Sequence, residues 1–374
     1  MRILHLVDSG GVYGAERVLL YLAREQHRLG HEPVIGSISK PGLAETEFEA
    51  FAKTWPARLV KIRMPRLPGP ATMRSLLSTV RQLAPDVLHS HGYKPNILLG
   101  LLPRRTRGPM LSTLHGWTGT SEWNALRLYE MLDRRALRRV DVVVAVSRAM
   151  AHAPALRALG SRLRMIENGI PAREQRLSDL AERHARPLPP ELLQAARAQP
   201  TLLAVGRLSP EKGFNLLIEA FYRHRRAGGR FGRLVIVGDG PQRPQLQAQL
   251  ATLGLADAVA LPGYVEGPDR LLEQAAGFVM SSLTEGMPMA LLEAIQWPRP
   301  VLATSVGEIP QILQGSPRAV LVAPNSVDEL VGGLERLQSL PPTAPARDDL
   351  AARYTAERMA LEYDAAYRDA VHGS

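Results

Sequence analysis

The chain has 374 residues, of which 45% are hydrophobic and 22% charged, and its net charge is +10. This length favours two domains with sizeable cores over one continuous sheet. The absence of cysteine excludes disulfides, thiol catalysis and a Cys-ligated metal, and no apolar stretch approaches the roughly 20 residues that span a bilayer.

Short apolar runs alternate with helical segments along the chain, which is typical of parallel α/β layers. The alternation predicts two doubly wound domains, a connector with a short helix at 168–200, and a last helix over 355–371. The predicted strands of the first half are 3–7, 33–37, 59–62, 87–90, 110–114, 142–146 and 163–166, with helices over 15–29, 72–83 and 125–139. Those of the second half are 202–205, 234–237, 259–261, 278–280, 301–303 and 320–322.

A glycine-rich loop follows the first predicted strand and opens a helix. It contains Gly10, Gly11 and Gly14. Glycines let the backbone approach a ligand closely and leave helix amides for phosphate or acceptor hydroxyls. The spacing matches neither the Rossmann nor the Walker pattern, so this loop alone is a weak signal.

Three histidines stand at predicted strand ends, where doubly wound sheets bind ligands. His115 follows strand 110–114 and precedes a Gly-Trp loop, which makes it a candidate site residue or else an ordinary loop histidine. His89 lies near the end of strand 87–90, and His91 directly follows it. Their spacing could suggest a metal pair, but no third ligand is apparent, so we interpret them as structural or acceptor-side residues.

Positive charge is concentrated in the first half of the chain. Residues 1–175 hold 26 Lys and Arg against 14 Asp and Glu, whereas residues 176–374 hold 20 against 22. The predicted helix at 127–139 has a basic face that could meet anionic lipid headgroups or a pyrophosphate-linked acceptor, or could simply be solvated. Zinc-finger spacing, a recognition-helix signature and aromatic-basic interleaving are all missing, so nucleic acid is not a predicted partner.

The start of the chain is a short apolar strand broken by an acid and glycines, too short for the core of a signal peptide. We therefore expect a cytoplasmic protein that is at most peripherally attached, through its basic first domain, to the inner face of the membrane.

The second half opens with a strand that runs into a turn-rich basic loop. Arg207 and Lys212 lie on this loop, after strand 202–205. A planar guanidinium fork and a mobile ammonium suit a diphosphate, although surface charge is the plain alternative.

Two glutamates flank a predicted helix start further along. Glu285 lies in a glycine-proline turn, and Glu293 lies about two turns along the helix that follows. A helix start offers free amides and a positive dipole end to an anion. The carboxylates could hold hydroxyls of a sugar and a ribose while the amides hold phosphate. The alternative is an acidic loop followed by a solvated helical glutamate.

Taken together, these two motifs resemble the retaining glycosyltransferases of family 4, which have the GT-B fold. In that family an Arg and a Lys five residues apart bind the donor diphosphate, as Arg207 and Lys212 would. An E-x7-E motif, matched by Glu285 and Glu293, closes on the sugar nucleotide.

The resemblance implies two doubly wound Rossmann-like domains that face each other across a cleft. Residues 1–172 would bind the acceptor, with a terminal helix at 352–374 crossing back to them, and residues 173–351 would bind the donor. The glycine loop resembles the family's first-strand loop, although Val12 and Tyr13 look like an insertion.

The resemblance also implies roles for the site residues. Glu285 would hold the sugar hydroxyls and Glu293 the ribose, while Arg207 and Lys212 would stabilise the leaving diphosphate. His115 would touch the donor sugar. The remaining donor-binding candidates are Gly10, Gly11, Gly14, Tyr264, Val265, Gly286, Met287, Pro288 and Met289.

The implied enzyme is a metal-independent hexosyltransferase without a cofactor, because no Asp-x-Asp triplet is present to hold a cation. Its donor would be a UDP- or GDP-sugar and its acceptor a glycan or polyprenyl-linked hydroxyl in cell-surface polysaccharide or lipopolysaccharide biosynthesis. The alternatives are a catalytically silent glycan- or lipid-binding subunit, and a nucleotide-sugar epimerase or phosphorylase with the same two-domain plan.

Overall fold

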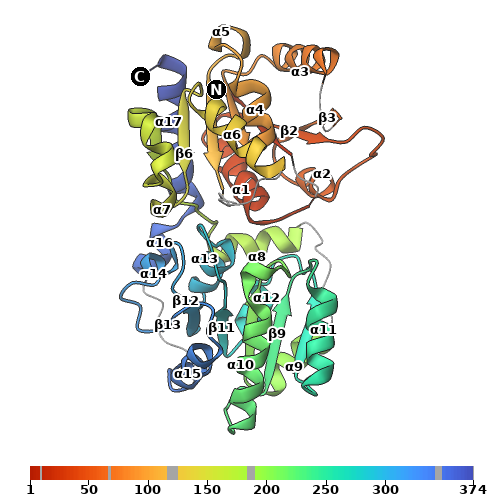
Figure 1. Ribbon diagram of the computed structural model, residues 1–374, viewed down its shortest axis with the longest axis vertical. Coiled ribbons are helices and arrows are strands. Elements are labelled where there is room, and N and C mark those ends of the chain that lie inside the picture. Colours follow the sequence, from red (N-terminus) through yellow and green to blue (C-terminus); the bar gives the residue numbers. More distant parts are fainter. Residues whose placement is uncertain (9–10, 66–68, 116–124, 183–189, 342–347, 374) are drawn as a thin grey trace. The chain divides into compact units, whose positions relative to one another are not determined.

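The structure is a computed structural model, and it describes residues 1–8, 11–65, 69–115, 125–182, 190–341 and 348–373. Contacts divide the chain into two compact units, Met1–Ile170 with Tyr354–Ser374 and Pro171–Arg353. Each unit contains one sheet covered by helices (Figure 1).

The first unit is built on a seven-stranded parallel sheet in the order β3-β2-β1-β4-β5-β6-β7. All seven strands predicted for this half are confirmed. They are β1 (Arg2–Val7), β2 (Glu32–Ser39), β3 (Arg58–Arg63), β4 (Val87–His91), β5 (Met110–Leu114), β6 (Val142–Ala145) and β7 (Leu163–Met165).

The helices of the first unit include the three that the sequence predicts. The three predicted helices are α1 (Gly14–Arg28), α3 (Pro70–Leu83) and α6 (Ala125–Leu137). The others are α2 (Glu47–Ala52), α4 (Tyr93–Gly100), α5 (Arg104–Arg107), α7 (Arg148–Ala151) and a 3-10 segment η1 (Pro154–Arg162). α1 begins where the Glu16 carboxylate accepts the Tyr13 backbone N–H at 3.0 Å, and it ends on His27 and Arg28, which suit the helix dipole.

The last helix, α17 (Ala356–His372), belongs to the first unit, as the resemblance to the GT-B enzymes implies. It contacts α1 and the strands β4, β5 and β6. Its start is capped by Thr355, whose side chain accepts the Arg358 backbone N–H at 3.2 Å. Tyr363 and Tyr367 are its largest buried side chains, and both are at most 1% exposed. The core of the first unit is therefore completed by the end of the chain.

The second unit contains a six-stranded parallel sheet in the order β10-β9-β8-β11-β12-β13. All six predicted strands are confirmed as β8 (Thr201–Val205), β9 (Arg233–Val237), β10 (Val259–Gly263), β11 (Gly277–Met280), β12 (Val301–Thr304) and β13 (Ala319–Val322). The helices are α8 (Arg173–Glu182), α9 (Pro190–Ala198), η2 (Pro210–Lys212), α10 (Phe214–Arg226), α11 (Arg243–Thr252), α12 (Asp269–Gln274), α13 (Met289–Ile295), α14 (Ile309–Ile312), α15 (Val327–Gln338) and α16 (Asp348–Arg353).

The sequence pattern does not predict α4. Its apolar residues follow no one-sided stripe, so it lacks the periodic signal of an amphipathic helix. It begins after Gly92, whose φ of +106° belongs to a region that glycine adopts readily. The sharp turn at Gly92 brings Tyr93 and Lys94 to the carboxyl end of β4.

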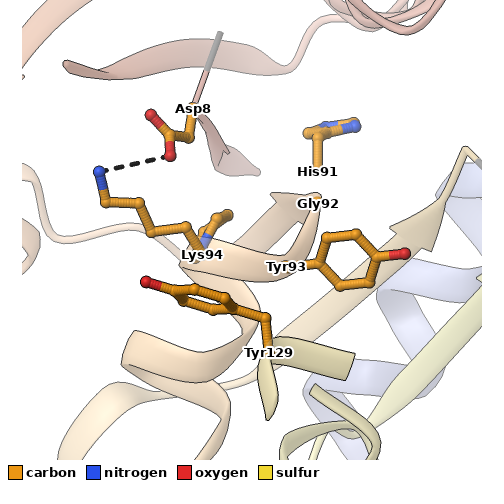
Figure 2. Close-up of a pocket in the computed structure, with 7 residues that line it drawn as sticks. Asp8, His91, Gly92, Tyr93, Lys94 and Tyr129 are labelled. Atoms are coloured by element: carbon orange, nitrogen blue, oxygen red, sulfur yellow. Dashed lines mark ion pairs between the residues drawn. The ribbon is translucent and has the colours of Figure 1, made fainter. Parts of the chain in front are cut away.

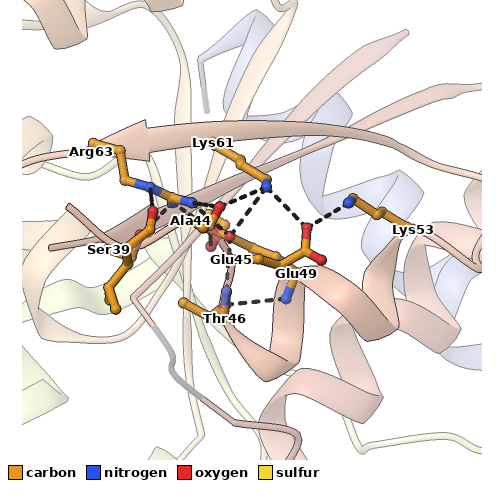
Figure 3. A network of polar contacts seen from close by, with 10 residues as sticks. Ser39, Ala44, Glu45, Thr46, Glu49, Lys53, Lys61 and Arg63 are labelled. Carbon is orange, nitrogen blue, oxygen red and sulfur yellow. Dashed lines mark hydrogen bonds and ion pairs between the residues drawn. The ribbon is translucent and has the colours of Figure 1, made fainter. Parts of the chain in front are cut away.

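A charged network ties β3 to α2 in the first unit (Figure 3). The Glu49 carboxylate is fully buried and accepts hydrogen bonds from Arg63 at 2.5 and 2.8 Å and from the Ser37 hydroxyl at 2.9 Å. Lys61 Nζ lies 3.9 Å from the same carboxylate. The Arg63 guanidinium is the main cause that lowers the pKa of Glu49 to about 2.

Replacing Arg63 with methionine is expected to lower the free energy of unfolding by about 2–4 kcal/mol, because a buried carboxylate loses its bidentate partner. The depressed pKa means that the pair stabilises the fold above pH 4.5 and that this contribution is lost as the pH falls toward 2. Urea unfolding at pH 7 measures the loss. Adding Glu49→Gln to Arg63→Met should restore part of the lost free energy of unfolding. A double variant that is as unstable as Arg63→Met alone would contradict this account.

Candidate active site

Two loops meet at the centre of the second unit's sheet. β8 and β11 are neighbours, and the order of strands along the chain reverses between them. Ligands of doubly wound sheets bind at the carboxyl ends of the strands at such a switch point. The loop after β8 holds Arg207 and Lys212, and the loop after β11 leads to Glu285. The two motifs that the sequence singles out therefore leave the sheet side by side.

Backbone contacts fix these two loops against each other. The Leu283 N–H donates to the Glu211 carbonyl oxygen at 2.7 Å, and the Ser281 hydroxyl donates to the Lys212 carbonyl oxygen at 2.9 Å. Gly213 has a φ of +61°, and a Cβ there would lie 2.3 Å from the Ser281 carbonyl oxygen. Only glycine fits this close approach.

Lys212 and Glu285 form an ion pair across the two loops. Lys212 Nζ donates to Glu285 Oε1 at 2.5 Å, and the Ser282 hydroxyl donates to the same oxygen at 2.7 Å. The two charged side chains are 22% and 9% exposed. Because both donors share Oε1, the second oxygen, Oε2, is the one that a bound hydroxyl could reach. The ammonium remains part-exposed and can meet an anion as well.

The other residues of the two motifs differ in exposure. Arg207 lies on the loop after β8 with an exposed side chain. Met287, Pro288 and Met289 are buried at the start of α13. Glu293 is only 1% exposed, so the alternative of a solvated helical glutamate is wrong. A buried carboxylate has a larger effect on a nearby polar ligand than a solvated one, because water screens it less.

Tyr264 and Val265 follow β10, which is an edge strand of the same sheet. Tyr264 is 53% exposed, and the carbonyl oxygen of Gly263 before it accepts a hydrogen bond from the Gly238 N–H at 2.8 Å. β9 separates this loop from β8 in the sheet, and the role at a base stays a prediction.

A cavity of about 350 Å³ opens at the corresponding switch point of the first unit, between the ends of β1 and β4 (Figure 2). Asp8 follows β1, and Lys94 on α4 forms an ion pair with it at 3.3 Å. The rings of Tyr93 and Tyr129 also line the cavity. Tyrosine rings beside one acid and one base suit a polar ligand with an apolar ring face, such as a sugar.

No sequence motif indicates this cavity, although Asp8 follows the first predicted strand and Tyr129 lies in the predicted basic helix. The available signal was the Tyr93-Lys94 pair directly after a strand end. Without the order of the strands, that pair could not be matched to the end of β1.

The glycines of the first loop are only partly described. Gly10 lies outside the described residues. Gly11 is buried, and a Cβ there would lie 2.9 Å from the ring of Tyr13, which covers it. Gly14 is the first residue of α1. A phosphate contact at this loop stays a prediction.

Four histidines meet at the carboxyl half of the first sheet. His115 Nε2 lies 2.9 Å from His91 Nδ1, and His91 Nε2 lies 3.0 Å from His5 Nδ1. The expectation that His89 and His91 have no third potential metal ligand beside them was wrong. His5 on β1 pairs in register with His89 on β4, and the ligating atoms of His5, His89 and His91 lie within 4.8 Å of one another. Burial lowers the pKa of His5 and of His115 to about 4 and holds the pKa values of His89 and His91 well below the usual range.

Models of two glycosyltransferase families match this chain. Glycosyltransferase Family 4 matches residues 12–174, and Glycosyl transferases group 1 matches residues 199–339. The chain belongs to the family 4-like glycosyltransferases. The second matched segment lies within the second unit, and the first lies within the first unit except for residues 171–174.

This family 4-like chain also resembles individual proteins. It is 30% identical over 165 residues to the alpha-D-kanosaminyltransferase of Streptomyces kanamyceticus, covering 44% of this chain and 42% of that protein. It is 26% identical over 266 residues to the putative colanic acid biosynthesis glycosyltransferase WcaL of Escherichia coli, covering 69% and 61%. The matches thus span less than two thirds of these two relatives.

The fold is that of solved GT-B glycosyltransferases. The crystal structure of Anabaena HepE in complex with UDP-glucose superposes with a TM-score of 0.77 at 20% identity, covering 99% of this chain and 100% of that one. At this identity the likeness establishes the fold, and the chemistry must be argued from the residues of this chain.

The basic face predicted over 127–139 is present on α6 and the turn that follows it. Arg134, Arg135, Arg138 and Arg139 have exposed side chains, and Met131 beside them is 60% exposed. Arg139 also donates to the Leu101 carbonyl oxygen at 2.6 Å. Among the described residues, the family 4-like chain has no helix with the length and apolar character needed to cross a bilayer.

The buried histidines predict that the fold loses stability in acid. A histidine whose pKa falls from 6.5 to about 4 on folding binds its proton in the unfolded state first, so stability falls as the pH drops from 6.5 toward 4. Each such histidine should contribute a slope of about 1.4 kcal/mol per pH unit within this window. Urea unfolding at a series of pH values measures the slope. His115→Asn should reduce the slope by the contribution of one histidine, about 1.4 kcal/mol per pH unit. A free energy of unfolding that does not change between pH 6.5 and 5 would contradict the burial argument.

Proposed function

We propose that the chain is a retaining glycosyltransferase that moves a hexosyl group from a UDP- or GDP-sugar to a hydroxyl of an acceptor. The observation that carries the proposal is the Lys212–Glu285 pair at the switch point of the second unit, where one part-exposed cation and one carboxylate oxygen lie together. A cation beside a hydroxyl acceptor is what a sugar diphosphate requires. The HepE structure with UDP-glucose supports a donor of this class.

In the proposed reaction, breaking the bond between the sugar C1 and the phosphate oxygen leaves negative charge on the diphosphate. Lys212 and Arg207 would stabilise that charge more strongly in the transition state than before it. Glu285 Oε2 would accept a sugar hydroxyl, and Glu293 would hold the ribose. The leaving phosphate would take the proton of the acceptor hydroxyl on the same face. We propose that the reaction needs no metal, because basic groups of the chain itself neutralise the diphosphate.

For the acceptor we propose the cavity of Figure 2, with Asp8 accepting a hydroxyl and the tyrosine rings flanking a sugar. The colanic acid relative supports a glycan as the acceptor, and we propose that this glycan is linked to a polyprenyl lipid. The exposed arginines of α6 would place such an acceptor near the anionic inner face of the cytoplasmic membrane. Cell-surface polysaccharide biosynthesis, lipopolysaccharide included, is the proposed context.

A thermal-shift screen of UDP- and GDP-sugars tests the donor first, because a ligand that binds the folded state raises the unfolding temperature by mass action. The stabilising sugar is then incubated with polyprenyl-phosphate-linked glycans, with and without EDTA. Release of the nucleoside diphosphate that depends on acceptor, resists EDTA and yields a product with the donor's anomeric configuration by NMR is the expected result. Inversion, or a requirement for a divalent cation, would overturn that part of the proposal.

The same assay separates the alternatives. An epimerase would convert the nucleotide sugar without releasing the diphosphate, and a phosphorylase would release a sugar phosphate with inorganic phosphate as co-substrate. A catalytically silent subunit would bind a glycan or nucleotide sugar without turnover with any acceptor offered.

A further inference from the structure

A chain of hydrogen bonds, part-buried at His115 and buried from His91 onward, joins His115 to the last helix of the first unit. From His115 Nε2 it passes to His91 Nδ1 at 2.9 Å, and from His91 Nε2 to His5 Nδ1 at 3.0 Å. His5 Nε2 then meets Gln26 Oε1 at 2.8 Å, and Gln26 Nε2 donates to the Tyr367 hydroxyl at 2.8 Å. The four residues from His91 to Tyr367 are at most 6% exposed.

The amide of Gln26 decides the direction of these bonds. Its oxygen can only accept, so His5 must donate from Nε2. A neutral imidazole carries one N–H, so His5 Nδ1 accepts and His91 must donate to it from Nε2. The same reasoning makes His91 Nδ1 an acceptor and places the proton of His115 on Nε2. His115 is thereby left with an unprotonated Nδ1.

The other side of Gln26 follows the same rule. Because Gln26 donates to the Tyr367 oxygen, the hydroxyl proton of Tyr367 is given to His89 Nδ1 at 2.7 Å. His89 Nε2 then donates to the Thr113 hydroxyl at 2.8 Å. Thr113 and Tyr363 share the last bond at 2.9 Å, in which either oxygen can be the donor. The amide of Gln26 therefore determines which group donates in each hydrogen bond as far as Thr113. Only the bond between Thr113 and Tyr363 can run in either direction.

We propose that Gln26 and Tyr367 are positioning residues that act through His5 and His91 to hold the proton of His115 on Nε2, so that Nδ1 accepts a hydroxyl of the bound sugar. The contact with sugar rests on the proposed function, whereas the position of the proton does not. A reversed amide at Gln26 would reverse the bonds through His5 and His91 and turn His115 Nδ1 into a donor. The side chain of a residue on α1 would thus determine what His115 offers to a ligand.

The imidazoles of His5, His89 and His91 also lie close enough together to bind a metal ion. Both nitrogens of His5, His89 and His91 are engaged in the bonds described, and a metal ion would have to break at least the His5–His91 bond to bind there. The two arrangements are mutually exclusive, so the metal content of the protein is part of the test.

Histidine tautomers can be read directly from long-range nitrogen–proton NMR spectra of the full chain labelled with nitrogen-15 histidine. At pH 7.5 the wild-type protein is expected to show His5, His91 and His115 as Nε2–H tautomers. A proton on Nδ1 of His115, or a stoichiometric transition metal in the purified protein, would overturn the proposal. This measurement needs no substrate and no variant.

The variant Gln26→Met removes both polar atoms at nearly constant volume. His115 is then expected to populate both tautomers, and kcat/KM to fall roughly two- to fivefold, in proportion to the competent fraction. The matched control is Tyr363→Phe, which removes a buried hydroxyl from the same helix where the direction is already free, and it should leave the His115 tautomer unchanged. Retention of the pure Nε2–H tautomer in Gln26→Met would refute the positioning role.

The outcomes separate this inference from the proposed function. A tautomer that changes in Gln26→Met while the wild-type chain transfers no sugar would support the network and reject the enzyme. If the wild-type protein transfers sugar but the His115 tautomer does not change in Gln26→Met, the enzyme is supported and the network is rejected.

Discussion

Replacing Lys212 with methionine is expected to reduce kcat by about 10²–10³-fold, which is the usual cost of removing one group that stabilises developing negative charge. Methionine keeps the length and apolar stem of the side chain but removes the ammonium that lies 2.5 Å from Glu285. Arg207→Met should act in the same direction, because its exposed guanidinium lies on the same loop. Release of nucleoside diphosphate at saturating donor and acceptor measures the effect.

The control removes a positive charge from a residue outside the proposed site. Arg223 on α10 is exposed and pairs at the surface with Glu219 and Asp328, so Arg223→Met should keep the parent turnover. Thermal unfolding of each variant checks that the fold survives. Parent-like turnover in both Lys212→Met and Arg207→Met would remove the basis of the proposed donor site.

Replacing Glu285 with glutamine is expected to reduce kcat/KM by about 10²-fold. Glutamine keeps one oxygen that can accept from Lys212 and Ser282, so the contact between the loops survives. The second oxygen becomes an NH₂ group, which donates where the sugar hydroxyl would need an acceptor. The substitution thus isolates the recognition of the hydroxyl from the structure of the loops.

The kinetics of Glu285→Gln distinguish ground-state from transition-state effects. A rise in KM with unchanged kcat would mean that Glu285 holds the sugar equally well throughout the reaction, whereas equal losses in kcat and kcat/KM would place the contact in the transition state. Asp257→Asn, an exposed acid in the turn before β10, is the control for charge. If the donor's thermal shift and both kinetic constants stayed at parent values, Glu285 would not be a ligand of the sugar.

Much of the fold could be predicted because parallel strands buried on both faces read as continuous apolar runs. The segment at 202–205 shows this well, since its leucines are fully buried in β8 between flanking helices. The segment at 87–90 follows the same pattern although it contains His89, which is fully buried in β4. In contrast, α4 carries no one-sided apolar pattern, and its helical state depends on packing against α6.

The site was predicted where short motifs carry it and missed where distant strands create it. Lys212 and Glu285 lie 73 positions apart, yet each belongs to a motif with its own spacing. His5 and His89 form no such motif. They meet because β1 and β4 are neighbours in the sheet, and periodicity within one segment does not encode the order of strands. The ion pair between Asp8 and Lys94 was missed for the same reason.

The place of α17 bears on how the chain is assembled during synthesis. The first unit needs Tyr354–Ser374, which are translated after the whole of the second unit, whereas Pro171–Arg353 is continuous and is complete earlier. The nascent chain therefore carries an unfinished hydrophobic surface, the one that Tyr363 and Tyr367 later cover, while all of the second unit is translated. Folding during synthesis therefore cannot complete the first unit before the second unit has been translated.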